Sequence, residues 1–252
     1  MFQKLGVQLF TIRDFLGSEE ELRRSFRKLK ELGYDQVQTC GCPISSYERF
    51  GELLREAELE VVGTHENFSL MLKDFDTSYR QHELLGTNHM GIGAFESATA
   101  EGWEQFVADA NRIGKKAAEK GGHFTYHNHC EEFAKLPDGR RPMDILKEGL
   151  DPKNTAFVLD TYWIQCGGGD VRRWIEELSG RISVLHLKDM GIHGETPFYA
   201  EIGQGNLYWE GILDAAEKAG AAYYVVEQDE CPGDPFESLR LSSEYLHKHF
   251  MR

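Results

Sequence analysis

The feature that most constrains the fold is a regular alternation of short apolar runs with longer segments of helical period. The short runs are strand-like, because they are rich in apolar, β-branched and aromatic residues and are bounded by turn residues. They cover residues 5–10, 35–39, 59–65, 89–94, 123–129, 156–160, 182–188 and 223–228. Each is followed by a predicted helix, and eight such units in 252 residues match a (β/α)8 TIM barrel in count and length.

The predicted helices have recognisable ends. Ser18 and Glu21 form a capping box, and Gly33 supplies the left-handed stop of the first helix. Further helices are predicted over 45–57, 74–85, 101–120, 142–150, 170–178 and 208–219, and Asp234-Pro235 opens the last. A doubly wound open sheet is the alternative, but it usually has fewer strands and a Gly-rich first turn, which FTIRDFLGS is not. No linker or repeat divides the chain, so we expect a single TIM-barrel domain over residues 1–252.

Two connections are longer than a barrel needs, over residues 130–141 and 189–207. Loops of this length are commonly lids or substrate-contact segments.

Charge and composition exclude several classes of partner. The chain has 42 acidic and 28 basic residues and a formal net charge of −14, which repels nucleic acid and anionic membranes. The N-terminal stretch MFQKLGVQLF lacks the layout of a signal peptide, and no apolar run is long enough to span a bilayer. We therefore expect a cytoplasmic protein with a small-molecule partner, with neither nucleic acid nor membrane as partner. The five cysteines are expected to be free thiols.

A barrel directs side chains at the C-terminal strand ends towards one shared site. The polar residues at these ends are Gln8, His65, Glu66, His127, Asn128, His129, Asp160, His186, Lys188, Glu227 and Gln228, with Glu132 just beyond. His89 and His123 begin their strands and are predicted to be structural. His82, His247 and His249 lie on predicted helices, and we expect them at the surface.

Three of these strand-end residues, Asp160, His186 and Glu227, come from three different strands. One carboxylate or imidazole from the fifth strand, where His127 and His129 share one face, would complete a mixed nitrogen and oxygen ligand set. Such a set suits Mn²⁺, Mg²⁺, Co²⁺ or Zn²⁺, and the absence of thiolates argues against a structural zinc site.

Several motifs resemble those of a known family. YHNHCEEF, LDTYWIQCGGGDV, VLHLKDM, EIGQGN and YYVVEQDE, with the opening GVQLFTIRD, are similar to the xylose-isomerase-like barrel superfamily and specifically to its sugar phosphate isomerase/epimerase proteins. The similarity runs over almost the whole chain. It implies one divalent metal ion, commonly Mn²⁺, and two glutamates that move a proton beside a sugar carbonyl. Homodimers and homotetramers are common among such proteins.

Carried onto this sequence, the resemblance implies the metal ligands Glu132, Asp160, His186 and Glu227. Epimerases usually have a glutamate inside strand five, whereas this chain has His127 there, so Glu132 is the expected fourth ligand and His127 or His129 the competing one. Glu132, Glu227, His127 and Lys188 are the expected catalytic residues. Lys188 would contact a substrate oxygen, or else form an ion pair with Asp189 or Glu227. The expected substrate contacts are Gln8, His65, His129, Trp163 and Lys188.

The favoured function is a metal-dependent isomerase or epimerase that moves a proton α to the carbonyl of a ketose or keto-sugar through an enediolate. The alternative is an eliminase or dehydratase acting on a 3-keto-glycoside or keto-inositol, suggested by the histidines of strand five. A non-catalytic ligand-binding barrel and an AP-endonuclease-like nuclease are less favoured. The nuclease needs a histidine ligand three residues after the strand-six aspartate, where this chain has Trp163.

Overall fold

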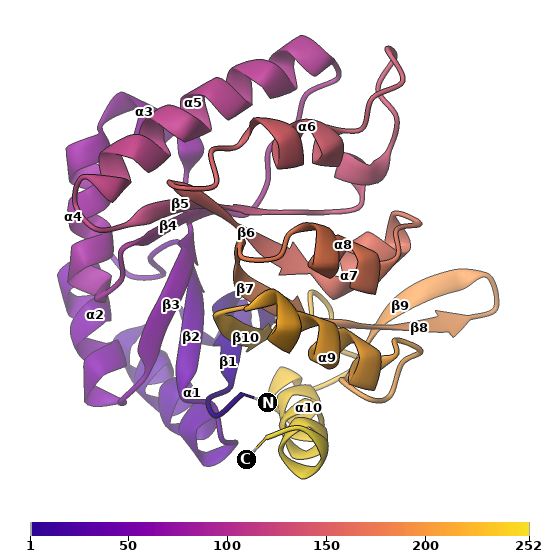
Figure 1. The fold of residues 1–252 in the computed structure, drawn as a ribbon. Helices are drawn as coiled ribbons and strands as arrows, with labels where there is room; N and C mark the ends of the chain where they lie inside the picture. The colour runs from indigo at the N-terminus through magenta and orange to yellow at the C-terminus, as the bar shows by residue number, and fades with distance from the viewer. Residues whose placement is uncertain (1, 252) are drawn as a thin grey trace.

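A computed structural model describes residues 2–251, and its centre is the predicted barrel (Figure 1). The barrel strands are β1 Gly6–Gln8, β2 Gln36–Cys40, β3 Glu60–His65, β4 His89–Ile92, β5 His123–His127, β6 Thr155–Asp160, β7 Ile182–Leu187 and β10 Tyr223–Val226. Their order in the sheet is β3-β2-β1-β10-β7-β6-β5-β4, and every pairing in it is parallel. The prediction of a TIM barrel is confirmed.

The barrel closes between β3 and β4. The backbone N–H of Glu66 donates to the carbonyl of Gly91 at 2.8 Å, which joins the ends of these two strands. Gly91 permits this approach, because a Cβ at that position would lie 2.2 Å from the carbonyl oxygen of Thr64 and 2.5 Å from Oγ1 of Thr125.

The helices surround the strands, and their ends follow the sequence signals (Figure 1). The predicted helices are α1 Glu19–Glu31, α2 Tyr47–Glu56, α4 Phe75–Leu85, α5 Ala100–Ala118, α6 Pro142–Gly149, α8 Val171–Glu177, α9 Trp209–Ala219 and α10 Pro235–His249. The hydroxyl of Ser18 accepts from the backbone N–H of Glu21 and donates to its carboxylate, so Ser18 caps α1 as predicted, with the carboxylate of Glu21 bonded to the hydroxyl. Asp234 accepts from the backbone N–H of Phe236 and caps α10.

Sequence patterns missed the short elements that lie inside connections. These are the 3-10 helices η1 Leu9–Phe15 and η2 Glu131–Phe133, the helices α3 Phe68–Lys73 and α7 Thr161–Cys166, and the antiparallel hairpin of β8 Asp189–His193 with β9 Thr196–Ala200. The hairpin projects from the body of the barrel (Figure 1). The two long predicted loops therefore contain η2 and the hairpin.

The interior of the barrel contains a small apolar cluster between the two groups of polar residues. Val62, Val158, Val184 and Val225 form a buried cluster in the interior. His89 and His123 begin β4 and β5, and their rings lie 4.1 Å apart, away from the strand ends that carry the candidate site.

One predicted surface residue is buried. His82 on α4 is 1% exposed, and its ring nitrogens hydrogen-bond to Oγ1 of Thr64 at 2.7 Å and to the carbonyl of Ser78 at 2.6 Å. The surface prediction for His82 is wrong, because its helix face turns towards β3. Among residues 2–251, no helix is both long and apolar enough to cross a membrane.

Candidate metal centre

Four buried side chains converge at the C-terminal end of the barrel. They are His127 at the end of β5, Asp160 at the end of β6, His186 in β7 and Glu227 directly after β10. One ligand atom from each lies within 4.8 Å of all the others. Oδ2 of Asp160 is 3.3 Å from Nε2 of His127, and Oε2 of Glu227 is 3.0 Å from Nδ1 of His186.

The two histidines are oriented through their outer nitrogens. Nδ1 of His127 is 3.0 Å from the carbonyl of Gly93, and Nε2 of His186 is 2.5 Å from Oε1 of Gln38. Oxygens of carbonyl groups only accept, so these outer nitrogens carry protons and act as donors. The inner nitrogens then face the carboxylates, which is the arrangement seen for metal-binding histidines. Burial works to lower the pKa of His186, but Glu227 and Asp160 outweigh it and raise that pKa to about 9, so the ring also carries a proton on its inner nitrogen. Two imidazoles and two carboxylates are a donor set that fits a divalent cation, which would take the place of that inner proton.

Glu132, the expected fourth ligand, lies outside this cluster. Its Oε1 accepts from the hydroxyl of Tyr126 at 2.5 Å, and its Oε2 accepts from the backbone N–H of His129 at 2.8 Å. Tyr126 points away from the barrel axis and packs against Phe106 of α5, with 5.3 Å between ring centroids. Successive residues of a strand face opposite sides, so Glu132 follows Tyr126 into the outer layer. The structure therefore brings His127, and not Glu132, to the other three predicted ligands.

Lys188 supplies positive charge beside the cluster. It is 1% exposed, and its Nζ lies 2.8 Å from Asp229, 3.3 Å from Glu227 and 3.7 Å from Asp160. Burial works to lower the pKa of Lys188, but these carboxylates outweigh it and raise the pKa, so the amine stays protonated. Of the two ion pairs considered for Lys188, the one with Glu227 is present.

The carboxylates of Asp160 and Glu227 remain ionised for the same reason. Burial alone would raise both pKa values, but the charge of Lys188, with contributions from the neighbouring histidines, holds them below their usual range. Oδ1 of Asp160 also caps α7 by accepting from the backbone N–H of Trp163 at 3.0 Å. This bond leaves Oδ2 of Asp160 to face the cluster.

A cavity of about 510 Å³ opens onto the cluster. Its lining includes His65, His127, His129, Glu227 and Asp229, but neither Asp160 nor His186. Glu227 is thus the carboxylate of the cluster that faces the cavity.

The predicted substrate contacts divide into two groups. His65 and His129 line the cavity, and burial lowers both pKa values, that of His129 to about 3, so both rings are neutral. Gln8 is fully buried behind them and lies 3.3 Å from Nδ1 of His65 through its amide nitrogen. Trp163 packs on His129, with ring centroids 5.1 Å apart. Nε2 of His65 and Nε1 of Trp163 are buried and have no hydrogen-bond partner among the described residues, and of the two residues His65 lines the cavity.

Sequence reasoning missed three polar residues that build the site. Gln38 is fully buried, and its Oε1 accepts from both Gln8 and His186. Asp229 lines the cavity and pairs with Lys188. The alternation of QVQT and the acidic run EQDE were the signals for Gln38 and Asp229.

Asp189 is the third, and its buried carboxylate organises the loop after the hairpin. It accepts from the backbone N–H groups of Met190, Gly203, Gly205 and Leu207 and from Nε1 of Trp209. The loop motif EIGQGN is therefore tied to the residue that follows Lys188.

Comparisons with known proteins identify the family of the chain. Residues 26–249 match the family described as xylose isomerase-like TIM barrel. An inosose dehydratase of Geobacillus thermodenitrificans (strain NG80-2) is 27% identical over 59% of this chain and 55% of its own length. The chain thus matches only about half of that curated relative.

Solved structures share the fold at low identity. A sugar phosphate isomerase/epimerase from Parabacteroides distasonis ATCC 8503 superposes with a TM-score of 0.81 and 22% identity, covering 98% of this chain and 94% of that one. An L-ribulose 3-epimerase gives a TM-score of 0.75 and 14% identity, covering 98% and 94%. These likenesses concern the fold, whereas the family match covers most of the sequence. The chain therefore belongs to the xylose isomerase-like TIM barrel family.

Proposed function

We propose that this protein is a metal-dependent enzyme that removes a proton beside the carbonyl of a keto-sugar or keto-cyclitol and then expels a leaving group from the β-carbon. The observation that carries this proposal is the buried cluster of His127, Asp160, His186 and Glu227, with one carboxylate facing a cavity. These four residues would hold the cation, with Mn²⁺ favoured and Co²⁺, Mg²⁺ or Zn²⁺ as alternatives. When bound, a divalent cation polarises the substrate carbonyl and stabilises the charge that develops on its oxygen.

The base is assigned to Glu227. It is ionised, it lines the cavity, and Lys188 keeps it in the carboxylate form. In a 3-keto-glycoside the proton would pass from C2 to the carboxylate of Glu227, and its C–H electrons would form the C1–C2 double bond. The C1–O bond would break as the leaving oxygen takes up a proton from water. His65 and His129 would hydrogen-bond the ring hydroxyls, since both are neutral and line the cavity.

Elimination is favoured over epimerisation because the cluster contains one glutamate, whereas the expected epimerisation mechanism uses two. Epimerisation removes a proton on one face and returns it on the other, and the expected pair of glutamates would have done this. Glu132 instead bonds to Tyr126 in the outer layer, so the cluster retains Glu227 as its one glutamate. The relative named inosose dehydratase supports the same choice.

Isomerisation or epimerisation of a ketose is the second candidate. The observation in its favour is His129, a second neutral imidazole lining the cavity, which could return a proton to the substrate. Solved structures that share the fold of the chain are also named as a sugar phosphate isomerase/epimerase and an L-ribulose 3-epimerase.

The test is product analysis on metal-loaded protein. A methyl 3-keto-glucoside, an inosose and a ketohexose are incubated in deuterium oxide and followed by NMR. We expect an unsaturated ketone and released methanol from the first, and loss of product with Glu227→Gln but not with Glu132→Gln. Deuterium exchange with an epimer and without a leaving group would replace elimination by the second candidate. Absence of both exchange and elimination would refute the proposal.

A further inference from the structure

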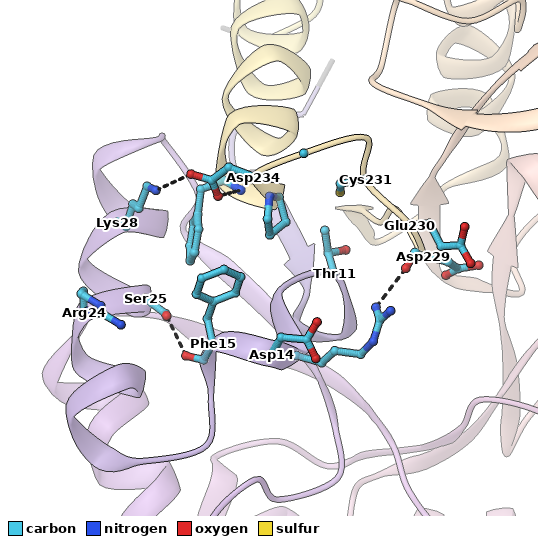
Figure 2. A pocket seen from close by; sticks show the side chains of 14 residues that line it. Thr11, Asp14, Phe15, Arg24, Ser25, Lys28, Asp229, Glu230, Cys231 and Asp234 are labelled. Carbon is cyan, nitrogen blue, oxygen red and sulfur yellow. Dashed lines mark hydrogen bonds and ion pairs between the residues drawn. The ribbon is translucent and has the colours of Figure 1, made fainter.

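A second cavity adjoins the metal-centre cavity. It has a volume of about 940 Å³ and lies between η1, the face of α1 that carries Ser25 and Lys28, and the start of α10 (Figure 2). The two cavities share Arg13, Asp229 and Glu230 in their linings, so they lie on either side of these three residues. Their volumes of about 510 and 940 Å³ together exceed the roughly 300–1,000 Å³ of a site for one small ligand.

Arg13 is an exposed residue that stands where the two cavities meet. Its Nη1 donates to the carbonyls of Phe10 and Asp229, both at 2.9 Å, and its guanidinium lies 4.2 Å from the centroid of the Phe10 ring. Within residues 2–251, no carboxylate forms an ion pair with Arg13 at 4.0 Å or less. A guanidinium has five N–H donors, so several remain for a ligand that passes between the cavities.

The walls of the second cavity combine an apolar face with polar edges. Phe15 packs edge-on against Phe236 with ring centroids 5.3 Å apart, and both line the cavity. Lys28 and Asp234 pair at 3.3 Å across one end, and Asp14 lines the cavity on the side of η1 (Figure 2). An aromatic wall with donors and acceptors at its rim fits a hydroxylated ring, which has an apolar face and a polar edge.

We infer that the second cavity is the subsite for the leaving group of a two-ring substrate, and that Arg13 hydrogen-bonds that group at the junction. The inference rests on the proposed function, because only a glycoside whose C1–O bond breaks presents such a leaving group next to the metal centre. The occupant is a hydroxylated ring, which a second sugar or a phenolic aglycone would supply.

The test measures binding without turnover. Metal-loaded protein is titrated calorimetrically with methyl β-glucoside, 4-hydroxyphenyl β-glucoside and cellobiose, which lack the keto group and are not eliminated. We expect at least one two-ring ligand to bind roughly tenfold tighter than the methyl glucoside, as one hydrogen bond to a charged group and ring burial would give. Tighter binding of 4-hydroxyphenyl β-glucoside would indicate a phenolic leaving group, and tighter binding of cellobiose would indicate a sugar.

Variants assign the effect to Arg13. Arg13→Met should reduce the preference for the two-ring ligand to within about threefold, because it should weaken binding of that ligand more than binding of methyl glucoside. Arg27→Met is the matched control, since Arg27 is exposed on α1 and lines neither cavity. Equal affinities for all three ligands, undetectable two-ring binding, or a preference that survives Arg13→Met would overturn the inference. The proposed function is judged separately by elimination from methyl 3-keto-glucoside, whose methyl group does not need the subsite.

Discussion

Replacing His127 by alanine should weaken divalent-metal binding by roughly 100-fold or more, whereas replacing Glu132 by glutamine should change it by less than about threefold. The prediction follows from where the two side chains lie. Nε2 of His127 is 3.3 Å from Oδ2 of Asp160, and its ring is held by the carbonyl of Gly93, whereas both oxygens of Glu132 are bonded in the outer layer. Loss of a residue that only supports a ligand typically costs 10–100-fold in metal affinity, so loss of a direct ligand should reach the top of that range or exceed it.

The main effect of Glu132→Gln should be on the stability of the fold. Glu132→Gln places an NH₂ group against one of two donors, the hydroxyl of Tyr126 or the backbone N–H of His129, and should lower the free energy of unfolding by about 1–3 kcal/mol. Calorimetric titration with Mn²⁺ and urea denaturation of the metal-free proteins measure both effects. A 100-fold loss of affinity in Glu132→Gln with little change in His127→Ala would refute the ligand assignment.

Three further substitutions test the surroundings of the site and the opposite end of the barrel. Asp189→Asn leaves at least two of five N–H donors without an acceptor and should lower the free energy of unfolding by about 3 kcal/mol or more in urea denaturation; an unchanged midpoint would contradict the role of Asp189. Lys188→Met removes the ammonium that pairs with three buried carboxylates and should lower the free energy of unfolding by about 3–5 kcal/mol in metal-free protein. Mn²⁺ should partly restore this stability, and a loss that Mn²⁺ does not reduce would speak against a nearby cation. Burial, together with the neighbouring His89, lowers the pKa of His123 from 6.5 to about 4. Between these two pH values the unfolded chain binds more protons than the folded one, so the free energy of unfolding should fall by up to about 3 kcal/mol as the pH is lowered from 6.5 to 4. His123→Phe should flatten that pH dependence, and an unchanged slope would exclude His123 as its source.

The barrel was predictable because its signals are local and repeated. Each strand is a short apolar run, and caps such as Ser18 and Asp234 mark where helices begin. Short elements such as α7 were missed because six residues give too few turns to establish a helical period. The hairpin of β8 and β9 was missed because its strands, in the stretch from Asp189 to Ala200, lie outside the eight-strand repeat.

Strand alternation made the site residues predictable where they lie in or directly after a strand, but not in the loops beyond. Asp160, His186 and Glu227 stand at strand ends, and alternation places them on the barrel axis with His127. Glu132 lies beyond the strand, where the direction of a side chain depends on the loop. Its hydrogen bond to Tyr126 is a contact that no periodicity encodes.

The measurement that tests the central claim most directly is deuterium exchange at the carbon beside the substrate carbonyl, followed by NMR while Mn²⁺ is added to metal-free protein. We expect no exchange without metal, and a rate of exchange that rises linearly with added Mn²⁺ until one ion is bound per chain. Glu227→Gln should abolish the exchange. Exchange that does not depend on metal would contradict the role of the four-residue cluster. A break at about three ions per chain would indicate a multi-metal site, and no exchange at any ratio would contradict the enolisation chemistry itself.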